Sequence, residues 1–210
     1  MLQKLKIRSI LANILSFYIM RNLEIKTYKS FSKELCEVWK KFELSSTNYF
    51  FQSFNWQKLW FDHQIKYNKK IENYTVVIFK NNKVIMVLPF NIDYNNHLKV
   101  LRWSGFPFSD YNAPLIRNDF EISKVEFLFI WETIISNNDF DCIFLDNQPE
   151  KIINLNNPFF DFLKKKINNY FYSIKFNEKF EIKKKEFDNI KNQKNRLKKL
   201  GKLEFKIAKD

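Results

Sequence analysis

Alternation of apolar and polar residues along the chain predicts a set of short β-strands. The first covers residues 23–28, and three more follow at residues 74–79, 84–90 and 98–103. Asn-rich turns separate the last three strands, and asparagine tolerates the left-handed conformation that tight hairpins need. Because tight turns join antiparallel neighbours, these three strands are predicted to form an antiparallel meander.

Apolar residues spaced three and four apart predict helices around this meander. Ser30 is a candidate N-cap for the first helix, which carries Phe31, Leu35, Val38, Trp39 and Phe42 on one face. Residues 45–48 follow as a loop, and a second amphipathic helix runs from Phe54 to Gln64. A third helix is predicted over residues 120–136, and Pro158 begins a short fourth one.

Two more strands are predicted in the second half of the chain. Residues 142–145 form an apolar run in which Cys142 is expected to be buried, and residues 170–176 alternate again. The resulting order is strand, two helices, meander, helix, strand, helix, strand. This order favours an α/β fold of the α+β type, with a central, mostly antiparallel sheet flanked by helices.

The C-terminal part of the chain differs from the body in its charge. Residues 183–202 predict a basic helix with Phe187, Ile190, Leu197 and Leu200 on one face, and residues 203–207 begin another strand. We therefore expect residues 22–180 to form the main domain and residues 181–202 to form a connecting helix. Residues 203–210 are expected to begin a second domain that this chain does not contain.

The first 21 residues are expected to be an extension of the main domain. Lys4, Lys6 and Arg8 precede an apolar stretch at residues 10–20, an outline that resembles a signal peptide. No small-residue cleavage site follows, however, and the stretch is too short to span a bilayer as a helix. We expect no transmembrane segment and a cytoplasmic protein, in which either Met1 or Met20 is the start.

The formal net charge of +13 is concentrated in two segments. Residues 1–22 carry +4 and residues 183–202 carry +7, which leaves only +2 for the remaining residues. A nearly neutral body with one basic helix is more typical of a solvated face or an interdomain contact than of a nucleic-acid reader. We therefore predict no nucleic-acid partner.

Cysteine and histidine are too sparse to suggest a disulfide framework or a metal site. The chain contains Cys36, Cys142, His63 and His97, and none of them lies near another in sequence. Structural zinc sites need four ligands of these types, usually in closely spaced pairs. No metal is therefore predicted.

Four short motifs occur in an order that resembles a known family. They are Phe51-Gln52-Ser53-Phe54-Asn55-Trp56, Val87-Leu88-Pro89-Phe90, Ser109-Asp110-Tyr111 with Ala113-Pro114-Leu115, and Asn195-Arg196-Leu197-Lys198-Lys199-Leu200. Together they resemble the F-Q-S-x-x-W, L-P-L, S-D-Y-x-x-P and basic-helix segments of CelD-like acetyltransferases. That family is associated with the synthesis of cellulose and other polysaccharides and belongs to the GNAT superfamily.

The resemblance implies a two-lobed acyltransferase of which this chain is the first, truncated lobe. GNAT lobes bind the pyrophosphate of acetyl-CoA or another acyl-CoA with a loop of the type Q/R-x-x-G-x-G/A at a helix N-terminus. This chain has only Gly105 and Gly201, and neither lies in such a loop. The acyl-CoA is therefore expected to bind mainly on the second GNAT-like lobe.

The resemblance also directs attention to Asp110 and Tyr111, which lie in a loop after a strand. Asp110 is the candidate to orient or deprotonate an acceptor amine or hydroxyl, and Tyr111 to donate a proton to the leaving thiolate. In the competing interpretation, Asp110 stabilises a turn and Tyr111 fills the core.

Five further residues are candidates for substrate binding. Gln52 and Ser53 could line the acceptor cleft, or they could simply cap the helix that follows. Trp56 and Trp103 could stack on a sugar ring, although such aromatic residues more often belong to a core. Arg196 could attract an acidic substrate or the phosphates of CoA, or it could lie on a solvated helix face.

Two classes of function fit these observations. The first is a lobe of an acyltransferase that moves an acetyl or acyl group from acyl-CoA to an amino sugar or polysaccharide precursor. This lobe alone is expected to be inactive. The alternative is a catalytically silent carbohydrate- or partner-binding module.

Overall fold

The computed structural model describes residues 22–67, 70–95, 97–137, 139–163 and 184–201. The chain divides into two compact units, Met1–Asn169 and Tyr170–Asp210, which are treated separately below. Three predicted segments lie outside the described residues: the extension at residues 1–21, the strand at residues 170–176 and the strand start at residues 203–210.

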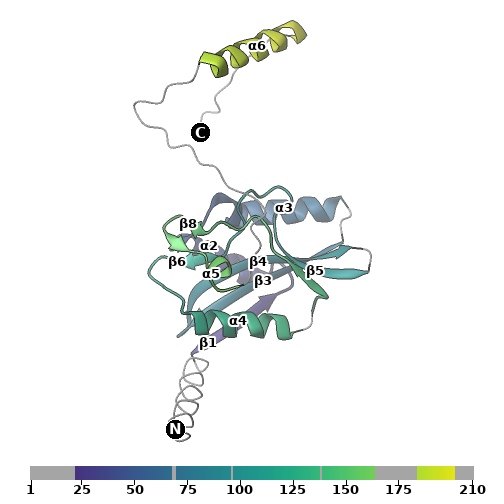
Figure 1. Cartoon of the computed structure of the whole chain (residues 1–210). Coiled ribbons are helices and arrows are strands. Elements are labelled where there is room, and N and C mark those ends of the chain that lie inside the picture. The colour runs from purple at the N-terminus through teal and green to yellow at the C-terminus, as the bar shows by residue number, and fades with distance from the viewer. Residues whose placement is uncertain (1–21, 68–69, 96, 138, 164–183, 202–210) are drawn as a thin grey trace, which may run out of the picture. The chain divides into compact units, whose positions relative to one another are not determined.

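A seven-stranded sheet forms the centre of the first unit (Figure 1). Its strand order is β1-β3-β4-β5-β7, and β6 pairs with both β4 and β2. All of these pairs are antiparallel except β5 with β7, which is parallel. The strands are β1 (Leu23–Tyr28), β2 (Ser46–Thr47), β3 (Ile71–Lys80), β4 (Lys83–Asn95), β5 (Leu98–Trp103), β6 (Leu115–Arg117) and β7 (Cys142–Phe144).

The predicted meander is confirmed, and its first turn shows why the sequence was informative. Asn81 and Asn82 join β3 to β4 with φ values of 51° and 60°, in the left-handed region that asparagine tolerates. Further along the chain, β8 (Lys151–Ile152) and β9 (Leu155–Asn156) form a separate small hairpin.

Helices cover both faces of the sheet, as Figure 1 shows. On one face, α2 (Lys33–Glu43) and α3 (Phe54–Lys66) pack over a core that includes Val77 and Val87. On the other face, α4 (Lys124–Ser136) and the short α5 (Pro158–Phe162) cover a larger core. The predicted α/β fold, with a mostly antiparallel central sheet flanked by helices, is thus confirmed.

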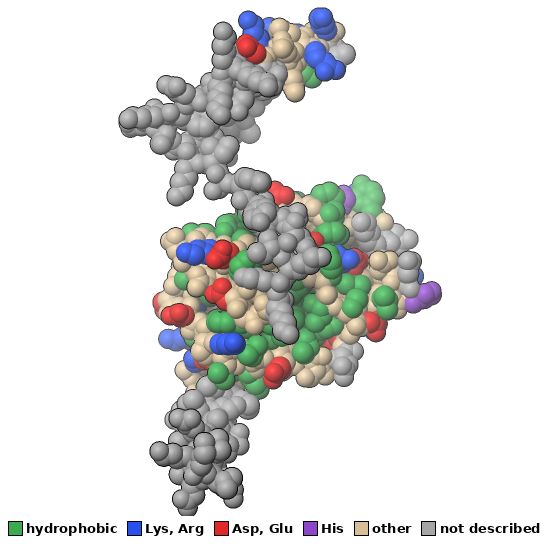
Figure 2. Space-filling view, in the orientation of Figure 1, with side chains coloured by type: hydrophobic (Ala, Val, Ile, Leu, Met, Phe, Trp, Pro, Cys, Tyr) green, Lys and Arg blue, Asp and Glu red, His purple; other side chains and the backbone are tan. Residues whose placement is uncertain are grey.

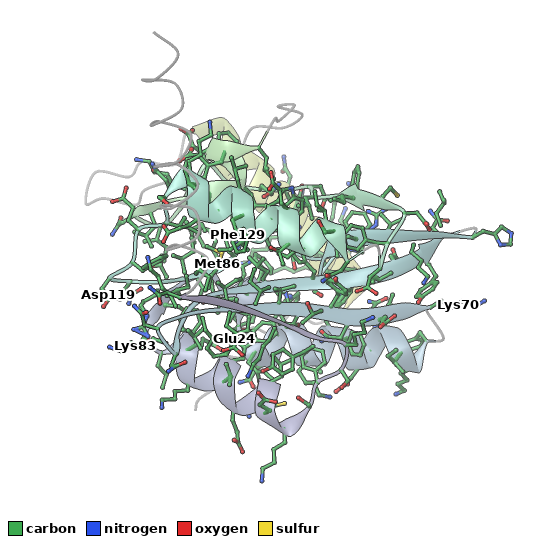
Figure 3. The ribbon with its side chains drawn as sticks, turned by 90° about the horizontal axis from the view of Figure 1, so that it is seen from below. Glu24, Lys70, Lys83, Met86, Asp119 and Phe129 are labelled. Carbon is green, nitrogen blue, oxygen red and sulfur yellow. The ribbon has the colours of Figure 1, made fainter. Side chains whose placement is uncertain are left out.

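The interior and the rim of this unit differ in composition (Figure 3). Met86 of β4 is fully buried between the sheet and α4. The labelled charged residues Glu24, Lys70, Lys83 and Asp119 are all exposed. The apolar positions that were predicted from periodicity therefore form the interior, and the charged residues remain in water.

Serine caps the N-termini of the three longer helices of this unit. Ser53 Oγ accepts a hydrogen bond from Trp56 N at 3.3 Å, and Ser123 Oγ accepts one from Glu126 N at 3.3 Å. The prediction of Ser30 as the cap of α2 is wrong, because Ser32 Oγ accepts the bond from Leu35 N at 3.2 Å. Both serines precede the apolar face, and only the position of the first helical turn separates them.

Two other predictions need correction. Cys142 is exposed rather than buried, because β7 pairs only with β5 among the described residues and is an edge strand there. The predicted loop at residues 45–48 contains β2, since Ser46 and Thr47 pair with Arg117 and Ile116 of β6. A two-residue strand has no periodicity that a sequence could reveal.

The described part of the second unit consists of α6 (Lys184–Leu200) and Gly201. This helix confirms the prediction of a basic helix, and residues 191–199 along it are all exposed. Within the described ranges of the chain, no helix combines the length and the apolar character needed to span a bilayer.

Candidate functional site

The central sheet opens beside β4, and this opening positions the candidate site. The second half of β4 pairs with β5 as far as Phe90 opposite Trp103, whereas Val87 already pairs with Leu115 of β6. Residues 104–114 therefore leave the sheet as a loop, which we call the strand-end loop. Edges where strands separate are common places for binding sites, because loops there stand on a rigid scaffold.

The carboxyl end of β7 meets the strand-end loop. The parallel register places Arg102 of β5 beside Phe144 of β7. Beyond that point, Asn112 N donates a hydrogen bond to Asn147 O at 2.9 Å, and Asn147 Nδ2 donates one to Ser109 O at 3.2 Å. The loop after β5 and the segment after β7 are thus held together by backbone and side-chain bonds.

Gly105 gives the strand-end loop its shape. Its φ is 105°, a conformation that residues with a Cβ rarely adopt. Ser109 N and Phe108 N donate to Gly105 O at 3.0 and 2.7 Å, and a Cβ at Gly105 would collide with Ser109 Oγ. The glycine therefore closes a tight turn, and the space beside it is filled by Ser109.

Gln52 fixes the backbone of Tyr111 from the other side of the loop. Its side chain is only 1% exposed, and its Nε2 donates to Tyr111 O at 2.6 Å. Its Oε1 accepts from Tyr49 N at 3.0 Å, which completes a capping box before α3. Ser53 then caps α3 itself. Gln52 and Ser53 thus serve as caps, and Gln52 also holds the strand-end loop.

Aromatic side chains border the strand-end loop, and we call them the aromatic wall. Trp56 Nε1 donates to Ser109 Oγ at 3.3 Å, and Tyr111 stacks on Tyr49 with ring centroids 5.1 Å apart. The ring centroids of Phe50 and Phe51 lie 5.4 and 5.5 Å from that of Trp56. Because Phe50 is 67% exposed, the wall reaches the surface of the protein.

The structure brings five of the seven candidate residues together. Asp110 is exposed at the tip of the loop, Tyr111 is half-buried beside it, and Gln52, Ser53 and Trp56 lie around them. Trp103 does not join this group: it is 1% exposed and packs on Phe90 and Phe159 in the core. Arg196 belongs to α6 in the second unit.

Sequence reasoning missed Asp146, which follows β7. Its Oδ1 is buried and has no hydrogen-bond partner among the described residues. Burial raises the pKa of Asp146, and the opposing effects of its own backbone, Arg102 and Asn112 do not cancel this rise. A carboxyl group that is buried and incompletely paired is typical of functional sites.

Arg102 is the cation whose charge opposes the rise in the pKa of Asp146. Its guanidinium lies 4.7 Å from the ring centroids of both Phe106 and Phe144, and its Nε is 3.5 Å from Asp93 Oδ2. Both rings thus lie within the range of a cation–π contact with the guanidinium. The sequence signal for this pair is weak, because Arg102 lies within β5 and only Asp146 follows its strand, β7.

The N-terminus of α4 does not fit the pyrophosphate of an acyl-CoA. Ser123 Oγ accepts from Glu126 N, and Glu126 Oε2 accepts from Ser123 N at 3.0 Å, so a capping box already occupies these donors. Burial would raise the pKa of Glu126, but hydrogen bonds from Lys80 and Ser123 lower it overall. A carboxylate thus stands where a phosphate would have to bind.

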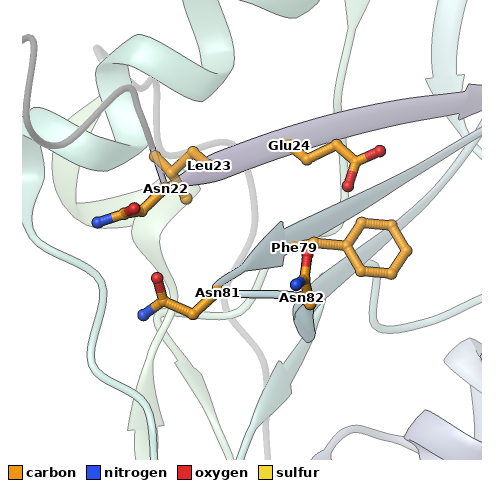
Figure 4. A pocket seen from close by; sticks show the side chains of 6 residues that line it. All are labelled: Asn22, Leu23, Glu24, Phe79, Asn81 and Asn82. Atoms are coloured by element: carbon orange, nitrogen blue, oxygen red, sulfur yellow. The ribbon is translucent and has the colours of Figure 1, made fainter.

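Among the described residues, neither a candidate metal site nor the hollow at the β3–β4 turn coincides with the strand-end loop. The described residues contain no group of three or more His, Cys, Asp or Glu that could hold a metal ion. A hollow of about 350 Å³ lies at the β3–β4 turn (Figure 4), lined by Asn22, Leu23, Glu24, Phe79, Asn81 and Asn82. It is a shallow, polar surface feature that shares no residue with the strand-end loop.

Comparison with known proteins gives only distant structural likeness. No family model and no curated protein matches the chain. A GNAT family acetyltransferase of Staphylococcus aureus aligns at 12% identity over 73% of this chain and 99% of its own, with a TM-score of 0.39. An aminoglycoside acetyltransferase from an uncultured soil metagenomic sample, solved in complex with sisomicin, aligns at 10% identity. The alignment covers 75% of this chain and 99% of that protein's chain, with a TM-score of 0.39. Both TM-scores lie below 0.5, so no argument about this chain is built on them.

Proposed function

We propose that this chain is the acceptor-binding lobe of a GNAT-type, CelD-like acyltransferase. The reaction would move an acetyl or other acyl group from acyl-CoA to an amine or hydroxyl of an amino sugar or polysaccharide precursor in the cytoplasm. The observation that carries the proposal is the strand-end loop, which carries the exposed Asp110 and is bordered by an aromatic wall that reaches the surface. Asp146, in the segment after β7, is joined to this loop by the hydrogen bond from Asn112 Nδ2 to its backbone oxygen. The motif resemblance described above supplies the reaction class.

The residues of the loop suit an acceptor that is both flat and polar. Aromatic faces such as Trp56 offer an apolar surface to the ring carbons of a sugar, while polar groups at the edge bind its substituents. Asp110 would pair with the acceptor ammonium and accept its proton, and Tyr111 would act as a general acid. Gln52 would position both by holding the Tyr111 backbone.

The acyl donor is proposed to bind mainly on a second GNAT-like lobe. The support is the N-terminus of α4, where a capping box of Ser123 and Glu126 takes two amide donors, Ser123 N and Glu126 N. The turn at Gly105 offers no cradle either, because its amide donors at Phe108 and Ser109 already bond to the Gly105 carbonyl. These two places in the described part of the first unit therefore offer no set of free backbone amides that could bind a phosphate.

A thermal-shift experiment on the full chain tests the proposal. Glucosamine should raise the melting temperature, because a ligand that binds only the folded state stabilises it by about 2.7 kcal/mol at 100 times its Kd. Acetyl-CoA should give no shift. Asp110→Asn should weaken glucosamine binding about tenfold, the loss expected for one charged hydrogen bond.

Asp119→Asn is the matched control, because Asp119 is an exposed loop aspartate outside the strand-end loop. It should leave the glucosamine shift unchanged. Stabilisation by acetyl-CoA, together with an unchanged glucosamine response in Asp110→Asn, would contradict the proposal. Equal binding of glucosamine and N-acetylglucosamine would instead favour the silent carbohydrate-binding module.

A further inference from the structure

The helix α6 concentrates positive charge on an exposed surface. Between Lys184 and Leu200 the chain has seven lysine or arginine residues and only two acids, Glu186 and Asp188. Residues 191–199 are all exposed, and Figure 2 shows the Lys and Arg side chains clustered over this helix. None of its described cations takes part in a salt bridge with another described residue.

The helix is also amphipathic. Ile190 and Leu197 are seven residues apart, and Leu197 and Leu200 three apart, so these positions share one face of a 3.6-residue helix. Leu197 is 49% exposed although it is apolar. Lys191 and Lys199 lie at positions on the other side. Lys194 lies on the same face as Ile190 and Leu197, four residues after the first and three before the second. A strongly basic helix with an apolar stripe of leucine and isoleucine has the pattern of an interfacial membrane helix.

We propose that α6 binds the surface of membranes that contain anionic phospholipids, with its apolar face in the interfacial region and its cations on the headgroups. The charge of the helix complements such a surface, and lysine side chains can reach the headgroups from the edges of the apolar face. The helix would lie on the bilayer rather than cross it.

The sequence of the N-terminal segment supports the same partner. Residues 1–22 carry +4 and contain an apolar run at residues 10–20. A single weak anchor gives only marginal, reversible attachment, and stable attachment needs two signals. Two basic, apolar segments on either side of a nearly neutral body meet that requirement.

A nucleic acid would explain the charge of α6 but not its apolar face. Binding to phosphates requires only cations and polar groups. Burial of the Leu197 face against acyl chains accounts for both properties of the helix. The acceptor chemistry at the strand-end loop is a separate matter, so this inference stands independently of the proposed function.

Vesicle co-sedimentation of the full chain tests the inference. The chain should bind vesicles of phosphatidylcholine mixed with phosphatidylglycerol and should bind vesicles of phosphatidylcholine alone far more weakly. Added salt should release it, because screening shortens the reach of the surface potential. Each cation near an anionic surface contributes about 1 kcal/mol, which corresponds to a factor of about five in binding. A variant that lacks four of these charges should therefore bind at least about 100-fold more weakly. The four replacements are Lys191→Gln, Lys194→Gln, Arg196→Gln and Lys198→Gln.

A body variant with the same loss of charge is the control. Lys70, Lys83, Lys124 and Lys151 are exposed, and their combined replacement by Gln should weaken binding much less. Leu197→Gln should also weaken binding, because it removes apolar contact without changing charge. Equal effects of the two charge variants, or full binding by Leu197→Gln, would overturn the inference.

Two further results would assign α6 to another partner. In the first, a homopolymer RNA displaces the chain from the vesicles, and Leu197→Gln binds this RNA as well as the wild type does. That result would assign the helix to nucleic acid. A lower melting temperature of Leu197→Gln with unchanged vesicle binding would show that the apolar face packs against the protein itself. Either result contradicts the membrane proposal, and neither bears on glucosamine binding at the strand-end loop.

Discussion

Asp146 combines two properties that rarely occur together in a purely structural carboxyl group. Its Oδ1 is buried without a hydrogen-bond partner among the described residues, and burial raises its pKa. A folded-state pKa above the unfolded value means that the ionised carboxylate destabilises the fold. Residues that lower the stability of the folded protein in this way are commonly retained because binding or catalysis needs them.

The first prediction concerns Asp146→Asn. The variant should have a higher free energy of unfolding than the wild type near pH 7, because it removes an ionised group from a partly buried position. The difference should vanish below about pH 4, where the carboxyl is protonated in both the folded and the unfolded state. Urea unfolding followed by tryptophan fluorescence across this pH range measures it.

The same variant should bind glucosamine more weakly, so its stability and its binding should change in opposite directions. Asp119→Asn is the control and should leave both the unfolding free energy and glucosamine binding nearly unchanged at pH 7, since Asp119 is exposed. A lower stability of Asp146→Asn at neutral pH would show instead that Asp146 is a paired structural carboxylate.

The second prediction concerns Gly105→Ala. The new Cβ would have to accept a φ of 105° and would collide with Ser109 Oγ. Such backbone strain costs about 2 kcal/mol in the free energy of unfolding, and the displaced Ser109 should lose its bond to Trp56. Chemical denaturation gives the first effect and Trp56 fluorescence the second.

Gly201→Ala is the matched control, because nothing lies within 4 Å of a Cβ built there. Equal unfolding free energies for Gly105→Ala and Gly201→Ala would contradict the prediction. They would mean that the turn in the strand-end loop can change its conformation at little cost.

The residues of the candidate site were only partly predictable from the sequence. Asp110, Tyr111, Gln52 and Trp56 belong to motifs of contiguous residues, and the structure brings them together. Asp146 could not be found in this way, because its burial depends on a loop more than thirty residues earlier in the sequence. Trp103 and Arg102 are neighbours on a strand covered on both faces, so alternation alone did not show which of them points toward the core.

At the level of elements, local patterns predicted most strands and helices but not their surroundings. The Asn81-Asn82 turn fixes the β3–β4 hairpin locally, and it was predicted. Cys142 shows the limit: an apolar run is compatible with a central strand or an edge strand, and β7 is an edge strand among the described residues. Strand neighbours are a long-range property that periodicity does not contain.

The third prediction concerns the N-terminus of α4 and uses Glu126→Gln. The lowered pKa of Glu126 means that its ionised form stabilises the fold above its unfolded pKa of about 4.3. The variant should therefore lose about 1 kcal/mol of unfolding free energy at pH 7, because Lys80 loses its charged partner. The loss should shrink as the pH falls through the lowered pKa.

Glu132→Gln on the same helix is the control for this measurement, because Glu132 is exposed. It should leave the unfolding free energy nearly unchanged at pH 7. A destabilisation by Glu126→Gln that is as large at pH 3 as at pH 7 would refute the role assigned to the Glu126 charge.

At the scale of the whole molecule, charge and chemistry are divided between the two units. The first unit holds the strand-end loop with its carboxyl groups, and the second holds the described basic helix α6. The charge distribution of the sequence predicted the basic helix itself, within residues 181–202. The scarcity of glycine predicted that this part of the chain would not form a glycine-rich phosphate loop, and among the described residues a capping box of Ser123 and Glu126 occupies the N-terminus of α4.

The most direct test of the central claim is a two-dimensional ¹⁵N NMR titration of the full chain with glucosamine. Binding at the proposed acceptor site should shift the backbone amides of residues 105–112 and the indole N–H of Trp56, which bonds to Ser109 in the free protein. Acetyl-CoA should leave the amides of residues 123–126 unchanged. Glucosamine shifts that spare the strand-end loop, or acetyl-CoA shifts at the α4 N-terminus, would contradict the account.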